Sequence, residues 1–412
     1  MQQLAAMFLT SDKPHYPFEL PKGWEWTTLG DLFSLQAGKN IAAKEIYPEF
    51  SEIYKYPCFG GNGIRGFVSN FNRNGDFPII GRQGALCGNV NLAIGDFYAT
   101  EHAVVVERFS DTDLMWTYYV LIALNLNQYA TATAQPGLAV NVINDVIVPV
   151  PPFQEQCRIS KAVTRLFSLI NEIEHGKQKL QGTIKQTKSK VLDLAIHGKL
   201  VPQDLNDEPA NELLKRINPK AEIISDNGHY QKLPVGWCMT NIESLFEAVS
   251  AKRVLKSEWK NKGIPFYRAR EIVQLSKEGI ADKDLFVSKE HYSELKEKYG
   301  VPSCDDIMIS AVGSIGYTYI VKKGDVFYYK DASVLCLKNT NHWNPTFFKI
   351  WLASPFLQEQ MYKNSKGTTV NTITLEKLKG YVIPLPPITE QHRIVSKVED
   401  LFSQLDNIAS SL

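Results

Sequence analysis

The sequence predicts an α+β chain: two globular α+β domains joined by long antiparallel coiled-coil helices, with a pseudo-two-fold internal repeat. Three observations predict this class. Two blocks of sequence recur in the same order, the stretches between them read as short strands separated by turns, and apolar residues at 4-3 spacing follow the second block each time. Together they indicate a duplicated unit that ends in a helix.

The two recurring blocks mark the ends of each unit. Residues 11–24 read SDKPHYPFELPKGW and residues 225–237 read SDNGHYQKLPVGW. Downstream, residues 148–159 read VPVPPFQEQCRI and residues 383–394 read IPLPPITEQHRI. A repeat of this size indicates a tandem duplication of whole units, because solenoid repeats are much shorter.

The second unit is longer than the first. The offset between the copies is 213 residues at Trp24 and Trp237 but 235 at Arg158 and Arg393, which leaves about 22 extra residues in the second interior. A weaker echo has an offset of 230 and matches Gly137, Val140 and Asn141 with Gly367, Val370 and Asn371.

Domain boundaries follow from these blocks. The interiors hold strand-like runs such as FPIIG, HAVVVE, DIMISAV and SVLCL between Gly, Asn and Asp turns, with helical stretches such as LMWTYYVLIALNLNQYA. The predicted parts are an N-terminal segment (1–19), a first domain (20–152), a central helical region and linker (153–232), a second domain (233–387) and a C-terminal coiled-coil helix (388–412). Residues 1–9 are expected to supply a short part of the helical frame.

A 3.5-residue apolar repeat follows each proline-rich string, which is typical of a coiled-coil seam. The first helix, over residues 154–197, would be roughly 66 Å long at 1.5 Å per residue, and the second about half that. Neither stripe could be buried by a lone helix in water, so we expect the two helices to pair antiparallel. The predicted seam consists of Ile159, Val163, Leu166, Ile170, Ile173, Leu180, Ile184 and Val191 in the first helix and Ile394, Val398, Leu401, Leu405 and Ile408 in the second.

Composition points to a cytoplasmic globular protein. The chain has 412 residues with 44% hydrophobic and 22% charged residues and a net charge of +1. It has no apolar run long enough for a membrane helix and no signal-peptide pattern at its start. Its six cysteines are scattered singly, so we expect reduced thiols and no zinc motif.

Several strings in the sequence resemble catalytic motifs, but each lacks a residue or a local structure that the chemistry requires. Residues 61–66 match GxGxxG, but the following FVSNFNRNGDFP cannot form the helix that a dinucleotide site needs. Pro151-Pro152-Phe153 is preceded by Val150, where an amino-methyltransferase needs an amide or carboxylate. Glu101 and His102 have no further ligand at a suitable spacing, and no P-loop is present. We therefore expect no catalytic residue, no metal and no cofactor bound by this chain.

Local charge suggests where nucleic acid could bind. The net charge is −4 over residues 20–152 and +5 over 233–387, where basic and aromatic residues are interleaved. Arg and Gln can read base edges bidentately, although a solvated surface would have the same composition. The candidate DNA-contacting residues are Lys39, Asn62, Arg65, Arg73, Arg82, Gln83, Lys252, Arg253, Tyr267, Arg268, Arg270 and Lys366.

The strings quoted above resemble one family. LPKGW and LPVGW, the two PP-EQ-RI strings, the heptad helices and KSKVLDLAIHGKLVPQDLNDEPANELLKRI are together similar to the specificity (S) subunit of type I restriction-modification enzymes, over nearly the whole chain. GNGIRG, IIGRQGALCGNV and FYATEHAVVV resemble loops and strands of that family's target-recognition domains.

The resemblance implies a non-catalytic, sequence-specific DNA-binding subunit. Each target-recognition domain would read one half of a bipartite site in double-stranded DNA, and the coiled coil would set the spacer. The implied partners are two methyltransferase (modification) subunits, which carry S-adenosylmethionine and methylate adenine N6, and motor/nuclease restriction subunits that use ATP and Mg²⁺.

A scaffold is the alternative from another class. Two adhesin-like modules on a coiled coil, with no nucleic-acid partner, would explain the duplication and the heptads equally well. They would not explain why the two repeated units have nearly constant ends but divergent interiors. That pattern suits recognition domains that can be exchanged while the surface that binds other subunits stays the same.

Overall fold

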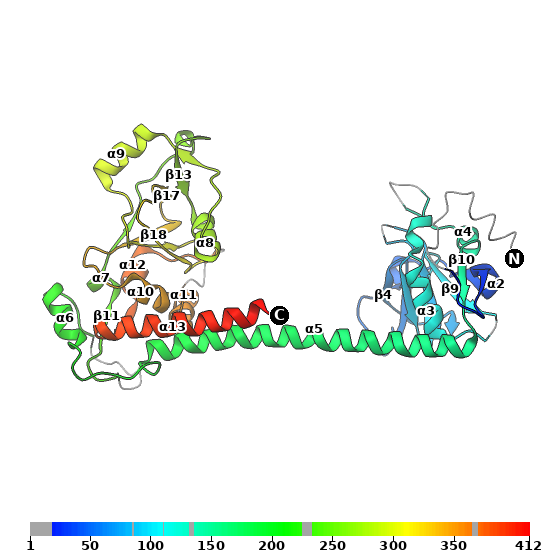
Figure 1. Ribbon diagram of the computed structural model, residues 1–412. Helices are drawn as coiled ribbons and strands as arrows, with labels where there is room; N and C mark the ends of the chain where they lie inside the picture. Colours follow the sequence, from blue (N-terminus) through cyan, green and yellow to red (C-terminus); the bar gives the residue numbers. More distant parts are fainter. Residues whose placement is uncertain (1–18, 85, 110, 132–135, 225–232, 365–369) are drawn as a thin grey trace. The chain divides into compact units, whose positions relative to one another are not determined.

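The computed structural model describes residues 19–84, 86–109, 111–131, 136–224, 233–364 and 370–412. They belong to two compact units, residues 1–174 and 175–412, and helix α5 (Phe153–Ile196) runs from the first unit into the second (Figure 1). Both units combine sheets with helices, so the predicted α+β class is confirmed. Of the predicted N-terminal segment, 1–19, only Glu19 lies within the described residues.

The first unit is closed by an antiparallel pair of strands from its two ends. In this pair β1 (Glu25–Thr28) lies beside β10 (Ile147–Val150), with Glu25 opposite Val150. One internal sheet has, in spatial order, the strands β2 (Phe33–Ala37), β9 (Ala103–Arg108), β6 (Phe77–Gly81) and β7 (Val90–Ala93). The other has β4 (Gly63–Val68), β3 (Tyr56–Gly60), β8 (Asp96–Ala99) and β5 (Arg73–Asn74).

Helices cover the first of these sheets. Helix α3 (Leu114–Ala123) starts at Asp113, whose side chain accepts a hydrogen bond from Trp116 N, and packs on β6 and β7. Trp116 and Leu121 join the buried core beneath it. The remaining short helices are α2 (Leu29–Leu32), α4 (Val140–Asn144) and the 3-10 turns η1 (Ala43–Glu45) and η2 (Leu126–Tyr129).

The second unit repeats this plan. Strand β11 (Cys238–Asn241) pairs with β19 (Val382–Leu385), with Cys238 opposite Leu385. The larger sheet has the order β12 (Glu247–Ser250), β18 (Val334–Lys338), β15 (Ile307–Ser310) and β16 (Thr318–Ile320). The smaller has β14 (Phe286–Val287), β13 (Ile264–Tyr267) and β17 (Tyr328–Tyr329).

More helices surround the sheets of the second unit than those of the first, in line with its longer interior. Helix α8 packs on β15 and β16, and α10 packs on α13. The helices are α6 (Ala210–Ile217), α7 (Ile242–Leu245), η3 (Lys256–Glu258), α8 (Ala269–Glu278), α9 (Lys289–Tyr299), α10 (Pro345–Leu352), α11 (Pro355–Asn364), α12 (Leu375–Lys379) and α13 (Ile388–Ser410).

Backbone hydrogen bonds correct the register of the weak echo. Leu138 N donates to Arg82 O, and Ile373 N donates to Ala311 O, both at 2.8 Å. These equivalent bonds match Leu138 with Ile373, at an offset of 235 residues, so the offset of 230 was wrong. The error arose because the backbone path repeats here while the side chains differ.

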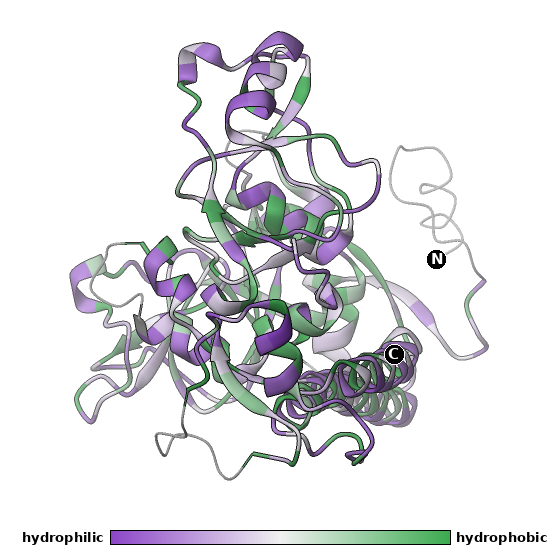
Figure 2. Cartoon of the chain, turned by 90° about the vertical axis from the view of Figure 1, so that its left-hand side faces the viewer, coloured by the Kyte–Doolittle hydropathy of each residue, from purple (hydrophilic) through white to green (hydrophobic). Residues whose placement is uncertain are grey.

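The predicted coiled coil forms only along part of α5. Helix α5 has 44 residues and α13 has 23, and α13 lies antiparallel beside the second half of α5 (Figures 1 and 2). Lys188 Nζ lies 2.5 Å from Asp406 Oδ1, and Lys177 Nζ donates to Leu412 O. The buried seam residues here are Ile184, Val191, Ile394 and Val398; Leu401 and Leu405 are half-buried, and Leu180 and Ile408 lie exposed at its margin.

The first half of α5 shows a different outcome. Leu166 is 59% exposed, Ile173 is 70% exposed and Ile170 is also exposed, while Ile159 and Val163 are half-buried. The expectation that the whole stripe pairs within the chain is therefore wrong for the described residues. The reason is length, because α13 is too short to cover both halves of α5.

Candidate nucleic-acid interface

Several strands of the first domain end along one edge, and their loops meet there. Lys39 N donates to Ala99 O and Arg82 N donates to His102 O, both at 3.0 Å. A Cβ on Gly61 would lie 2.6 Å from Gln83 O, so the 60–63 turn packs directly on the 82–88 loop. We call the loop residues at these strand ends the first edge. It brings together Lys39, Asn62, Arg82 and Gln83.

The first edge carries polar groups with spare hydrogen-bonding capacity. Arg82 is half-buried, and its Nε is buried without a partner among the described residues. Glu101 Oε1 lies 3.1 Å from His102 Nε2. Asn89 Nδ2 donates to Asn62 Oδ1 at 3.2 Å. Donors and acceptors in such a group suit the edges of bases, which present both.

The two other arginines of the first domain differ from each other. Arg65 is exposed and lies over Gly60, since a Cβ there would be 2.3 Å from Arg65 Cδ, so it belongs to the first edge. Arg73 sits within β5, and its guanidinium donates to Gln36 Oε1 at 2.9 Å. We therefore leave Arg73 out of the first edge.

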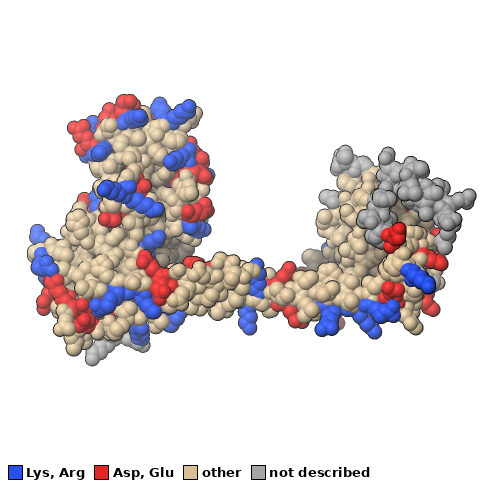
Figure 3. Space-filling model, viewed as in Figure 1, with Lys and Arg blue, Asp and Glu red and all other residues tan. Residues whose placement is uncertain are grey.

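The second domain has an equivalent edge, which we call the second edge. Strands β12 and β15 end beside the start of β18, where Ser250 pairs with Leu335 and Ser310 with Val334. The exposed Lys252 and Arg253 follow β12 directly. Basic and acidic side chains are interspersed on the face of this domain seen in Figure 3.

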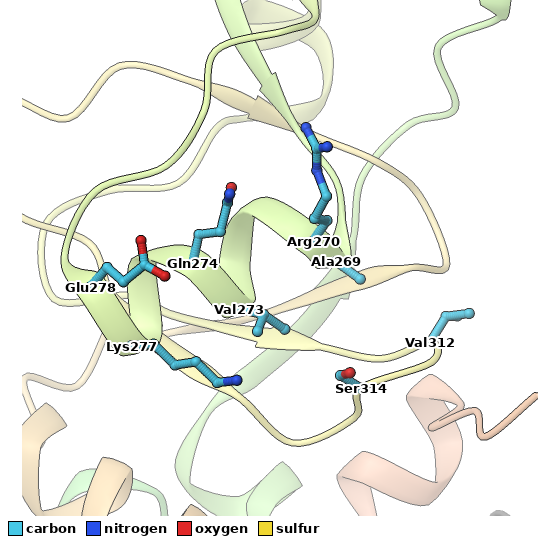
Figure 4. A pocket seen from close by; sticks show the side chains of 8 residues that line it. All are labelled: Ala269, Arg270, Val273, Gln274, Lys277, Glu278, Val312 and Ser314. Carbon is cyan, nitrogen blue, oxygen red and sulfur yellow. The ribbon is translucent and has the colours of Figure 1, made fainter. Parts of the chain in front are cut away.

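A cavity of about 410 Å³ opens at the second edge, between α8 and the 311–317 loop. Figure 4 shows Val273 and Lys277 extending from α8 toward the loop that carries Val312 and Ser314. Lys277 Nζ lies 5.0 Å from the centre of the Tyr317 ring. The cavity thus combines the apolar side chains of Ala269, Val273 and Val312 with polar and charged side chains, among them Arg270, Lys277 and Glu278.

Three candidates of the second domain serve its own fold. Glu271 is 2% exposed on its side chain, and Arg268 and Arg270 both donate to it, at 2.7 Å and 2.9 Å. Burial alone would raise the pKa of Glu271, but the hydrogen bonds from Arg268 and Arg270 and the charge of Arg268 together outweigh burial and leave the pKa lowered. Tyr267 is buried, with its ring 4.9 Å from that of Phe327.

We therefore do not include Arg268, Arg270 and Tyr267 in the second edge, although Arg270 also lines the cavity, and their contact with DNA stays a prediction. Lys366 lies outside the described residues. The predicted set did not include Gln274, Lys277, Val312 and Ser314, which line the cavity at the second edge. The signal for the last two was present, since GSIG at 313–316 echoes GALCG at 84–88 at the end of an apolar strand.

A second surface lies where each domain meets its helix. In the second unit the buried Glu390 accepts hydrogen bonds from Trp237 Nε1 at 2.9 Å and Gln203 Nε2 at 3.1 Å. Arg393 donates to Asp207 at 2.6 Å, and this bond lowers the pKa of Asp207. The segment with Gln203 and Asp207 is thereby fastened to the start of α13.

The first unit repeats the tryptophan, glutamate and arginine of this arrangement, but among the described residues it has no segment equivalent to the one with Gln203 and Asp207. Trp24, Glu155 and Arg158 correspond to Trp237, Glu390 and Arg393. Trp24 Nε1 is buried without a partner, and Arg158 is exposed without an ion pair, as far as the described residues extend. We call Trp24, Glu155, Arg158 and the exposed Leu166, Ile170 and Ile173 the open helix face.

The described part of the chain has no cluster of three or more His, Cys, Asp or Glu side chains that could hold a metal ion. The six cysteines are free, and burial raises the pKa of Cys58 and of Cys238 to about 11. Among the described helices, none is long and apolar enough to span a membrane.

Two domains built on one plan, each with a loop-bearing edge and linked by a long helix, define a class of protein: a chain that presents two recognition surfaces. Comparison with known proteins identifies the family. The family model described as "Type I restriction modification DNA specificity domain" matches residues 21–181 and 234–411. The chain belongs to this family and is a DNA sequence-specificity subunit of a type I restriction-modification system, a non-catalytic component. This excludes the scaffold alternative.

Similar proteins carry the same description. The type I restriction enzyme EcoprrI specificity subunit of Escherichia coli is 47% identical over 146 residues, which are 35% of this chain and 36% of that relative. A putative type I restriction enzyme specificity subunit, S.HindORF215P of Haemophilus influenzae, is 26% identical over 396 residues, 93% of this chain and 88% of that relative.

Solved structures share the fold. One, from work on complex assembly and conformational transition of the type I R-M system, has a TM-score of 0.64 at 16% identity and covers 96% of this chain and 94% of its own. The HsdS subunit from Thermoanaerobacter tengcongensis has a TM-score of 0.55 at 15% identity and covers 96% and 93%.

Proposed function

We propose that each domain reads one half of a bipartite site in double-stranded DNA through its edge, in the major groove. The observation that carries this proposal is that the same strand-end edge is built twice, with different side chains on the same backbone path. The proposed contacts are Lys39, Asn62, Arg65, Arg82 and Gln83 in the first domain and Lys252, Arg253 and Lys277 in the second.

The helices are proposed to fix the spacer between the two half-sites. Helix α5 has 44 residues, so it is roughly 66 Å long at 1.5 Å per residue. An α-helix stiffened by a partner keeps a nearly constant length, which suits a fixed number of base pairs between the halves.

The open helix face is proposed to bind partner subunits. Most of its residues repeat positions that are buried or half-buried in the second unit, whereas its Leu166, Ile170 and Ile173 are exposed. The proposed partners are two methyltransferase subunits carrying S-adenosylmethionine for transfer to adenine N6, and motor/nuclease subunits using ATP and Mg²⁺. We place this assembly in the cytoplasm, where bacterial DNA is found.

Genome-wide mapping of methylated adenine, with and without this protein, tests the proposal. We expect a two-part sequence with a constant gap that is methylated only when the protein is present. Arg82→Ala should relax one half of that sequence by about 1–3 kcal/mol if the guanidinium reads a base. Uniform weakening would instead assign Arg82 to phosphate, and an unchanged methylation map would contradict the proposed function.

A further inference from the structure

A three-bond backbone clamp holds the same short stretch in both domains. In the first, Arg82 N donates to His102 O at 3.0 Å, Leu138 N to Arg82 O at 2.8 Å and Gly84 N to Pro136 O at 3.0 Å. In the second, the same bonds join Ala311 N to Ser333 O at 2.9 Å, Ile373 N to Ala311 O at 2.8 Å and Gly313 N to Asn371 O at 2.9 Å. The two stretches are therefore structurally equivalent.

Each clamp presents one side chain. Gln83 and Val312 are the residues between the clamped positions, and both form isolated bridges, to Gly137 and Thr372. Gln83 is exposed, and Val312 is half-exposed beside the cavity. Their backbone is held by hydrogen bonds on both sides, so little backbone conformational entropy would be lost when the side chain meets a ligand.

The glycine that follows leaves room for a close approach. Gly84 has φ +90° and Gly313 has φ +79°, and a Cβ at either would meet no described residue within 4 Å. A side chain at these positions would be strained by the left-handed backbone, and it would also occupy the space in front of the clamp. A bulky partner can therefore reach residues 83 and 312.

We infer that residues 83 and 312 are equivalent base-reading positions, one for each half-site. This inference rests on the proposed function. Gln83 has the side chain that pairs bidentately with adenine N6 and N7 in the major groove. Val312, with Val273 beside it in the cavity, provides an apolar surface for the methyl group of thymine. Position 83 thus specifies adenine in one half-site, and position 312 specifies thymine in the other.

The test uses the assembled restriction-modification complex in cells that lack their own copy of this protein. Methylated adenine is mapped for the wild type and for Gln83→Ala, Gln83→Glu, Val312→Ala and Val312→Gln. Matched controls are Gln181→Ala, exposed on α5, and Val326→Ala, 50% exposed and outside the second edge. Thermal melting of each purified complex checks that the variants are folded and assembled.

Each outcome has a clear meaning. Gln83→Ala should lose discrimination at one adenine by about 5- to 150-fold, with the other half and the gap unchanged, and Gln83→Glu should shift that position toward cytosine. Val312→Ala should relax a single position in the other half, Val312→Gln should shift that position toward adenine, and the controls should change nothing. The inference would be overturned if both half-sites kept every base in the variants at positions 83 and 312. It would also be overturned if folded, assembled complexes lost methylation uniformly over all sequences. If the wild type itself adds no methylated sequence, the proposed function fails instead.

Discussion

At the residue scale, the arginines predicted to contact DNA differ in whether a buried carboxylate lies beside them. Arg82 keeps a buried Nε without a partner among the described residues, whereas Arg268 and Arg270 neutralise the buried Glu271. All three arginines look alike in the sequence, because the burial of Glu271 depends on how α8 packs against the sheet. Residue type alone therefore could not separate an arginine with a free buried donor from one that pairs with a buried carboxylate, and the DNA contacts of both edges stay predictions.

Arg268→Ala is expected to lower the free energy of unfolding by about 2–3 kcal/mol, because it leaves the buried Glu271 carboxylate with one cation in place of two. Arg253→Ala, which removes an exposed guanidinium from the same domain, is the control and should change stability by less than about 0.5 kcal/mol. Urea unfolding of the purified subunit measures both. Unchanged stability together with a relaxed half-site would return Arg268 to the readers.

The ion pair of Asp207 predicts a dependence on pH. The pKa of Asp207 is lowered from its usual 3.8 by the hydrogen bond from Arg393, so the folded state holds the proton less tightly than the unfolded state. The stability from this pair is present above pH 3.8 and is lost as the pH falls through the lower folded-state pKa. Asp207→Asn should cost about 1–2 kcal/mol at pH 7. This difference should shrink in unfolding measured at progressively more acid pH, and a constant difference would contradict the assignment.

At the element scale, α5 and α13 carry the same apolar stripe, which is covered in one helix and exposed in the other. Residues 159–173 of α5 and 394–408 of α13 match at an offset of 235. In α13 the seam is covered by the second half of α5, and in the first half of α5 it is open among the described residues. Heptad spacing predicted the apolar stripes of both helices but contained no information on which part of a stripe is covered.

This contrast predicts unequal effects of one kind of substitution. Ile394→Ala should lower the free energy of unfolding by about 2–5 kcal/mol, because Ile394 is 0% exposed and its loss leaves a cavity. Ile173→Ala, at a position 70% exposed, should change it by less than about 0.5 kcal/mol. Urea unfolding measures both. In a binding assay with the modification subunit, Ile173→Asp should weaken association, and unchanged association would argue against the open helix face.

At the scale of the whole molecule, a single helix links the two readers, so its length is the quantity to vary. Removing residues 166–172 takes one heptad from the half of α5 that α13 does not cover. The helix would become about 10.5 Å shorter, while its faces would turn by only about 20°. Such a deletion leaves the contacts between α5 and α13 in place.

The heptad deletion is expected to shorten the spacer of the recognised sequence by about three base pairs, at roughly 3.4 Å each, and to leave both half-sequences intact. Mapping of methylated adenine in cells that carry the deletant measures the spacer and the halves together. A spacer equal to that of the wild type would mean that α5 does not determine the gap.

The sequence by itself determined the duplication, the α+β class, the heptad seam and the family. Each of these depends on local pattern, such as the two PP-EQ-RI strings and the 4-3 spacing of apolar residues. Only the tertiary structure decided that Gln83 and Val312 are equivalent, that Arg268 serves the fold, and that the seam is covered in one half of α5. The physical reason is that register, burial and partner choice depend on contacts between residues far apart in the chain, such as Leu138 with Arg82 and Ile373 with Ala311.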